Sequence, residues 1–486
     1  MEHFNLPSED PSKKGASFIE RFFTSSLFKL GCTFFLVLVM LIPLSWVNEL
    51  ISERSDRSRS VEKEIASKWG NKQILSGPII GIPYVVEQTI KETDNSGNEK
   101  YQTVFDTKYI FLMAKNIDIK TDVTPTYLNR GIYRSVVYNS VSTIHGEFGE
   151  LDFSESDINE EDLSWKDAKV FVGVSDLKGI TTNPSIQWGG KKVSFKQGTK
   201  EINLFERVLE APIDLSNKST HGTFKIQLDL RGSSSLSVFP TADDTQLTVN
   251  GKWAFPSFGG GFLPKKREIG VNEFNASWQV PSFNRLFPSQ WSGSGKRMYT
   301  NSPEETESGV SDLVSPSTEA VSSSSMANQK DMIQVDFLET IDNYDKINRV
   351  SKYGILIVLL TFAALFFTEI IKNKPMHMIH YVLIGCAMVL FYTLLLAFSE
   401  HIGFNWSYLI ASVATISLVS CFIFWVTKDL KIAYLFSAIL VVFYLFIYCL
   451  MLLQDYALVA GTIGVFIILI VLMRWSAKIN WFNFKT

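Results

Sequence analysis

Two ionisable residues stand side by side in a short segment between two long apolar runs of this chain. Glu400 and His401 form this pair, and Asp455 lies in a comparable segment further on. A carboxylate beside an imidazole can bind a metal, sense pH or perform acid–base catalysis. Three residues from two segments provide fewer ligands than a closed zinc site uses. The pattern therefore favours polar caps that hold neighbouring helices together, with a functional site as the alternative.

Glu369 is the one acid close to the interior of an apolar run. Acids within membrane spans are often functional, but Glu369 stands near the end of its run. We therefore expect its side chain to reach toward the membrane surface or to pair with Lys372. The other runs have no interior charge of the kind that coupled transporters use at the membrane midplane, which weakens a transport hypothesis.

Arg349, Lys352 and Tyr353 stand where a long polar segment gives way to an apolar run. The two bases can bind lipid phosphates, and a tyrosine is a common anchor at a membrane interface. Simple anchoring is the favoured interpretation. The alternative is a hinge that transmits force or signal from the polar segment to the apolar one.

Known catalytic and cofactor motifs are missing from the sequence. It contains no GxSxG, HExxH, GxxxxGK[ST] or Rossmann glycine pattern. Lysine and arginine are not massed as nucleic-acid binding requires. The sequence therefore predicts a protein that is not an enzyme, needs no cofactor and does not bind nucleic acid.

The elements that position these residues are apolar helices. Crossing a bilayer takes about 20 apolar residues, and six runs qualify, at 27–47, 351–371, 380–398, 404–427, 432–453 and 456–474. All four cysteines lie within these runs, so the intervening region cannot contain a disulfide. We expect a lone N-terminal anchor and a separate group of five helices.

The short loops between the runs indicate orientation. Basic residues fall in alternate loops and after the last run, and the intervening loops have none; the bases are Lys372, Lys374, Lys428, Lys431, Arg474, Lys478 and Lys485. Basic loops stay in the cytoplasm. The termini, 1–26 and 475–486, are therefore predicted to be cytoplasmic and the region 48–348 extracytoplasmic.

The region 48–348 has the alternating pattern of half-buried strands. Strands are expected at 169–174, 224–230 and 245–249, and a hairpin joins 84–89 to 101–106 across Asp94–Gly97. The pattern predicts a mainly β domain, an antiparallel sandwich or extended sheet, which follows a charged helix at about 53–68. The Ser-rich stretch 301–330 has too few large apolar residues to fold and is expected to be a disordered insertion.

Several strings occur in an order and spacing shared with one known family. They are Trp69-Gly70, Gln73, Gly77-Pro78, the stretch 257–264, Trp278, Arg285, Trp291, Lys352-Tyr353-Gly354, the stretch 399–404 and the stretch 455–458. In these residues the chain resembles the CreD family of bacterial inner-membrane, cell-envelope integrity proteins. The insertion and Asn480, where an acid is expected, depart from the family pattern. The resemblance implies a non-enzymatic membrane protein linked to envelope integrity and stress response.

Together these features predict a six-helix bundle that carries a β-rich extracytoplasmic domain in the bacterial inner membrane. The expected partners are membrane lipid and an envelope protein or polymer. A transporter or flippase is the first alternative. A membrane-embedded hydrolase that uses Glu400 and His401 is the second.

Overall fold

The computed structural model divides the chain into two compact units. A helical unit comprises Met1–Arg57 with Ile341–Thr486, and a sheet unit comprises Ser58–Thr340. The residues that the structure describes are 26–93, 99–154, 158–198, 202, 204–285, 287–293, 298, 331–337, 343–372, 376–453 and 456–477. The expected insertion at 301–330 and both predicted cytoplasmic termini therefore lie largely or wholly outside the described residues.

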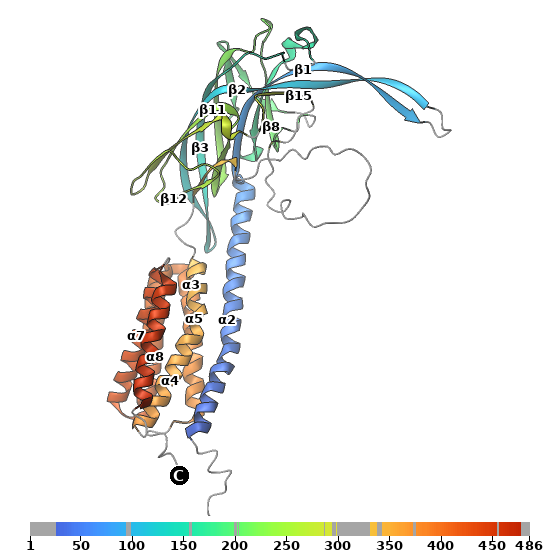
Figure 1. The fold of residues 1–486 in the computed structure, drawn as a ribbon. Coiled ribbons are helices and arrows are strands. Elements are labelled where there is room, and N and C mark those ends of the chain that lie inside the picture. Colours follow the sequence, from blue (N-terminus) through green and yellow to red (C-terminus); the bar gives the residue numbers. More distant parts are fainter. Residues whose placement is uncertain are drawn as a thin grey trace, which may run out of the picture. The chain divides into compact units, whose positions relative to one another are not determined.

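The first helix, α2 (Ser26–Trp69), is longer than expected and belongs to both units (Figure 1). The apolar run at 27–47 and the charged helix at 53–68 are one continuous helix rather than two. The residues between them, Asn48 to Ser52, include no glycine or proline, so nothing ends the helix there. The change in composition alters what surrounds the helix, and its backbone continues unchanged.

The other helices of the helical unit are α3 (Asn343–Lys352), α4 (Gly354–Lys372), α5 (Met378–Ile402), α6 (Phe404–Thr427), α7 (Leu430–Leu452) and α8 (Ala457–Ala477). Among the described residues, four helices are long and apolar enough to cross a membrane, and the bent pair of α3 and α4 makes a fifth. The apolar part of α8, Leu458–Arg474, is shorter, so the sixth crossing stays a prediction.

Two helix boundaries differ from the predicted ones. The run expected from residue 351 begins instead at Gly354, after a bend of 40° that separates it from α3. α5 continues to Ile402, so Glu400 and His401 lie in its last turn rather than in a loop. The helix ends at Gly403, whose φ of 78° is readily adopted only by glycine.

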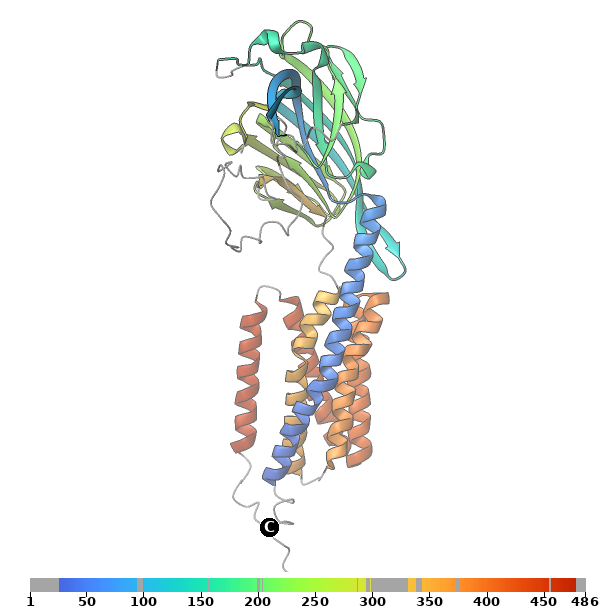
Figure 2. The same cartoon turned by 90° about the vertical axis from the view of Figure 1, so that its right-hand side faces the viewer.

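The sheet unit consists of one branched sheet of 16 strands in the described residues (Figure 2). Its strands are β1 (Gln73–Thr93), β2 (Glu99–Arg130), β3 (Tyr133–Phe148), β4 (Lys169–Val174), β5 (Ser185–Trp188), β6 (Lys191–Ser194), β7 (Lys196–Gln197), β8 (Arg207–Pro212), β9 (Gly222–Ser233), β10 (Ser235–Phe239), β11 (Ala242–Gly251), β12 (Pro256–Gly260), β13 (Lys266–Ile269), β14 (Phe274–Pro281), β15 (Gln290–Gly293) and β16 (Ile333–Phe337). The main path runs β12-β16-β10-β1-β2-β3-β9-β5-β6.

The predicted strands and hairpin are confirmed, and the predicted strand direction is only partly right. β4 matches the expected 169–174, and β9 alternates buried and exposed residues as expected. β1 and β2 form the predicted hairpin, although its turn lies outside the described residues. However, β1 pairs with β10 and β2 pairs with β11 in parallel. Parallel neighbours require a long connection between them, which a local alternating pattern does not reveal.

Candidate functional site

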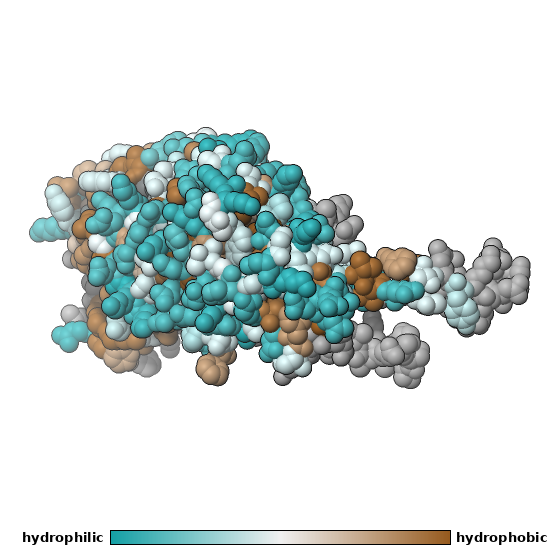
Figure 3. All heavy atoms as spheres, turned by 90° about the horizontal axis from the view of Figure 1, so that it is seen from above, coloured by the Kyte–Doolittle hydropathy of each residue, from teal (hydrophilic) through white to brown (hydrophobic). Residues whose placement is uncertain are grey.

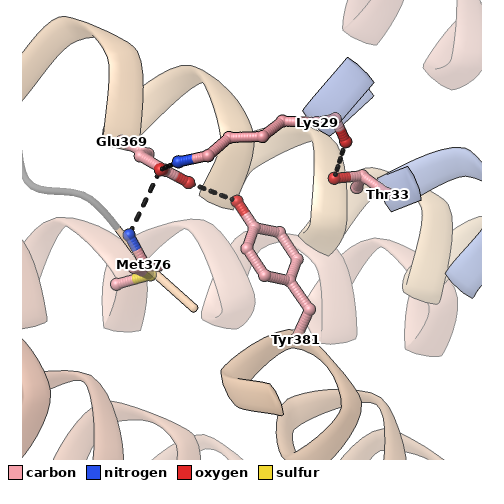
Figure 4. A network of polar contacts seen from close by, with 5 residues as sticks. All are labelled: Lys29, Thr33, Glu369, Met376 and Tyr381. Carbon is pink, nitrogen blue, oxygen red and sulfur yellow. Dashed lines mark hydrogen bonds and ion pairs between the residues drawn. The ribbon is translucent and has the colours of Figure 1, made fainter. Parts of the chain in front are cut away.

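Glu369 is a buried carboxylate near the end of α4, and three groups donate hydrogen bonds to it (Figure 4). Lys29 Nζ from α2 lies 2.7 Å from Oε1, and the backbone N–H of Met376 lies 3.2 Å from the same oxygen. Tyr381 Oη from α5 lies 3.0 Å from Oε2. The Glu369 side chain is only 9% exposed. The network joins α2, α4 and α5 at one end of the helical unit.

Glu369 pairs with Lys29, whereas the sequence suggested Lys372, whose side chain lies outside the described atoms. The two partners are 340 positions apart in the chain, so only the tertiary structure brings them together. A basic residue at the start of the first apolar run was the available signal, because that start and the end of the run that contains Glu369 are both predicted to face the cytoplasm. A carboxylate that already accepts three hydrogen bonds suits a structural lock between helices.

Glycines allow α2 to approach the other helices closely. A Cβ atom on Gly385 of α5 would lie 2.6 Å from Sδ of Met40, and one on Gly354 would lie 3.0 Å from both terminal methyls of Leu44. Small residues permit such close helix packing in membranes. The expectation of a lone anchor beside a separate group of five helices is therefore wrong, because α2 packs against α4 and α5.

Glu400 and His401 have different surroundings in the structure. Glu400 is half-buried and its Oε1 accepts a hydrogen bond of 3.1 Å from Tyr344 Oη of α3. His401 is exposed, and Asp455 lies outside the described residues. Within the described part of the chain, no group of three His, Cys, Asp or Glu residues could hold a metal ion. The contact of Glu400 fits a cap between α3 and α5.

The short helix α3 packs across the ends of the longer helices. It contacts α4, α5, α6 and α7, with Tyr344, Ile347 and Val350 buried on one face. Arg349 and Lys352 are exposed, and Tyr353 lies half-buried at the bend before α4. Nζ of Lys346 lies 5.8 Å from the ring centroid of Phe404. The predicted interfacial bases therefore belong to an amphipathic helix that sequence analysis did not detect.

Gln73 fixes the junction between α2 and the sheet unit. Its side chain is fully buried. Nε2 donates to the carbonyls of Asp176 and Arg231, and Oε1 accepts from the N–H of Asp176 and from the Ser175 hydroxyl. A buried amide with both ends paired holds its neighbours in one arrangement. The family-like string Trp69-Gly70 with Gln73 therefore has a structural role.

Trp69, the last residue of α2, is held from two sides at the same junction. Its Nε1 donates to the carbonyl of Tyr138 at 3.4 Å. The Arg231 guanidinium carbon lies 4.6 Å from its ring centroid, within the range of a cation–π contact. Neither Arg231 nor Asp176 was singled out by its sequence context.

The β1–β2 arm, residues 85–93 and 99–107, is the part of this hairpin that continues beyond the neighbouring strands (Figure 1). Among the described residues, no other strand pairs with the arm: β1 otherwise pairs only before residue 85, and β15 pairs with Tyr109–Leu112 of β2. Both outer edges of the arm therefore have no paired strand within the described part of the chain. Open strand edges are templates for pairing with another chain.

Three exposed apolar side chains lie among polar ones on one face of the β1–β2 arm. Val85, Tyr101 and Phe105 are 58%, 68% and 70% exposed. Residues opposite each other in an antiparallel pair lie on the same face, and the register places all three on one face. Val86 and Val104 are half-buried on the other face. Figure 3 shows hydrophobic residues on this projecting ribbon.

A hollow of about 710 Å³ opens on the sheet unit near the end of β5, with Trp188, Lys191, Asp214 and His221 in its lining. Nζ of Lys191 lies 3.6 Å from Oδ2 of Asp214. The pKa of Asp214 is lowered by hydrogen bonds from the Ser216 hydroxyl and N–H and by Lys191. Nδ1 of His221 lies 3.2 Å from the carbonyl of Phe148. These contacts account for the polar groups as ordinary surface interactions.

Comparisons of sequence with known proteins cover nearly the whole chain. A family model described as "Inner membrane protein CreD" matches residues 25–482. The Inner membrane protein CreD of Escherichia coli (strain K12) is 27% identical over 459 residues, which cover 94% of this chain and 94% of that protein. The similarity therefore includes α2, the sheet unit and the C-terminal helices together.

Proposed function

The chain belongs to the CreD family of inner membrane proteins, and we propose that it supports cell-envelope integrity or the envelope stress response without catalysing a reaction. In this proposal the helical unit is the multi-pass anchor. The sheet unit faces away from the cytoplasm and binds an envelope component, either a protein or a polymer. Both termini are cytoplasmic.

The distribution of basic residues supports this orientation. Lys372 is the last residue of α4, the segment between α4 and α5 contains Lys374, and the one between α6 and α7 contains Lys428. The pair of Lys29 with Glu369 places the start of α2 at the same end as the α4–α5 segment. Basic loops are retained in the cytoplasm, so the opposite ends, with α3 and Glu400, face outward.

The observation that carries the binding proposal is the group of exposed apolar side chains on one face of the β1–β2 arm. An isolated two-stranded ribbon is marginally stable in water, and this one presents Tyr101 and Phe105 to solvent. Exposed aromatic residues on a projecting element are typical of interaction surfaces. Open edges add the capacity to accept a strand from a partner.

The arm can be tested by photo-crosslinking of the full chain in its own membrane. A photoreactive residue at Phe105 should give one specific adduct with an envelope component. The same residue at Val104, which lies on the other face of the arm, is the matched control and should give little. Equal adducts from both positions, or none from Phe105, would contradict the proposal.

A functional test uses the same face. Replacing Tyr101 and Phe105 by serine should sensitise cells to envelope stress while the amount of protein in the membrane is unchanged. Thr103→Ser, on the same face, removes only a methyl group and should have no effect. Full resistance in the Tyr101→Ser/Phe105→Ser variant would show that the arm is dispensable.

Orientation has its own test, because all four cysteines lie in α2, α5, α6 and α7 and the sheet unit has none. After those four are replaced, Thr103→Cys should react with a membrane-impermeant thiol reagent that has access only to the outer face of the inner membrane. Reaction only after the membrane is broken would place the sheet unit in the cytoplasm.

A further inference from the structure

α6 and α7 are consecutive helices that are joined by a short turn and pack against each other. A groove of about 470 Å³ lies between them. Its walls include Trp406, Leu409 and Val413 of α6 with Val441, Leu445 and Tyr448 of α7. These residues belong to the half of each helix remote from the turn at Lys428 and Asp429. The groove therefore opens at the end of the helical unit where α3 lies.

The floor of the α6–α7 groove offers no free donor for a polar ligand. Tyr408 and Tyr444 are buried there, and Tyr408 Oη donates to the carbonyl of Tyr444 at 2.7 Å. Ser412 Oγ donates to the carbonyl of Leu409 at 3.0 Å. The lining contains no charged residue. An uncharged groove whose floor hydroxyls are paired, between membrane-spanning helices, suits a hydrocarbon chain.

The end of the groove is basic. Asn405 lines the groove, and Lys346 of α3 lies over the ring of Phe404, the residue before it. α3 contributes Lys346, Arg349 and Lys352 against the single acid Asp345, and Glu400 of α5 is bonded to Tyr344. The excess of positive charge favours an anionic group, and a phosphate is the anionic group of membrane lipids.

We propose that the α6–α7 groove binds one acyl chain of an anionic phospholipid whose phosphate lies against Lys346 and Arg349 of α3. The apolar groove and the basic helix together select an amphiphile with one negative end. The acyl chain would fill the groove between α6 and α7, and the phosphate would link α3 to the ends of these two helices. This site does not depend on what the sheet unit binds.

The groove is tested by native mass spectrometry of the full-length protein after exchange into mixed phosphatidylglycerol and phosphatidylcholine. Val413→Trp fills the groove and should abolish the retained lipid. Leu418→Trp is a matched control, because Leu418 is also on α6 and also 54% exposed but does not line the groove. Val441→Trp, with Val442→Trp as its control, repeats the test on α7 if Val413→Trp fails to fold. Equal retention in the groove and control variants would overturn the proposal.

The headgroup contact is tested by Lys346→Gln/Arg349→Gln. Each base near the surface contributes about fivefold to anionic preference, so the preference for phosphatidylglycerol should fall at least tenfold, that is about 1.4 kcal/mol. Lys428→Gln/Lys431→Gln, at the opposite end, is the control and should keep the preference. An unchanged preference in the α3 variant would overturn the proposed contact. Displacement of the lipid by excess inorganic phosphate alone would show a phosphate-ion site instead of a lipid site.

Discussion

Helix α2 carries one ionic cluster in each unit of the molecule, and the two clusters differ in their surroundings. In the helical unit, Lys29 meets a Glu369 side chain that is 9% exposed. In the sheet unit, Glu64 meets Lys68 and Arg130, and its side chain is 40% exposed. Both clusters use the same chemistry on the same helix. The comparison indicates that shielding from water decides whether an ion pair determines helix packing or adds little.

The largest effect is expected from Glu369→Ala. It leaves Lys29, Tyr381 Oη and the Met376 N–H without their acceptor, so the helical unit should lose about 3 kcal/mol of stability, near the low end for a broken buried pair because Lys29 is partly exposed. The loss would be measured by unfolding the full chain in mixed micelles with an increasing fraction of a denaturing detergent. Glu369→Gln keeps an acceptor and should lose less. If Glu369→Ala loses no more stability than Glu64→Ala does, the contrast between the shielded and the exposed ionic cluster is wrong.

Gln73→Ala is expected to have the next largest effect, in the sheet unit. It leaves the Asp176 N–H without its acceptor and removes one hydrogen bond each from the carbonyls of Asp176 and Arg231, which costs about 2 kcal/mol. Hydrogen exchange of the full chain should show faster exchange in β1, β4 and β9. Gln187→Ala, at an exposed position of β5, is the control. Unchanged protection in the Gln73 variant would show that the junction is held by other contacts.

Arg231→Ala should have a smaller effect on the same junction. It removes the cation–π contact with Trp69, and Arg231 is exposed, so about 0.5–1 kcal/mol is expected. Faster exchange confined to the last turn of α2 and the start of β1 would report the loss. Arg231→Lys should restore part of the protection, and the same exchange in both variants would exclude a charge-based contact.

Glu64→Gln should have the smallest effect. Hydrogen bonds from Lys68 and Arg130 lower the pKa of Glu64, so its contribution to stability is present above the ordinary glutamate pKa. That contribution is lost as the pH falls through the lowered pKa of the folded state. Thermal unfolding should show a slight difference between the wild type and the variant at neutral pH, which disappears in acid and in high salt. A difference that persists in high salt would contradict a solvent-exposed pair.

Local patterns were sufficient for the helices and many of the strands. The runs at 404–427 and 169–174 coincide with α6 and β4, because hydropathy and alternation act over neighbouring residues. The short helix α3 was missed because its ten residues mix three bases with four buried positions. The candidate site was only partly predicted. Glu369 was identified, whereas Lys29 and Tyr381 lie far from it in the chain or on another helix.

Composition alone determined the class of this protein: apolar helices at both ends of the chain enclose a polar, cysteine-free β region. Burial of apolar residues and the hydrogen-bonding needs of the backbone act on each segment wherever it lies. Only the tertiary structure decided that α2 packs on α4 and α5, that Glu369 meets Lys29, and that β1 and β2 each gain a parallel neighbour. These arrangements depend on contacts between distant residues, whose energies are realised only when the whole chain is folded.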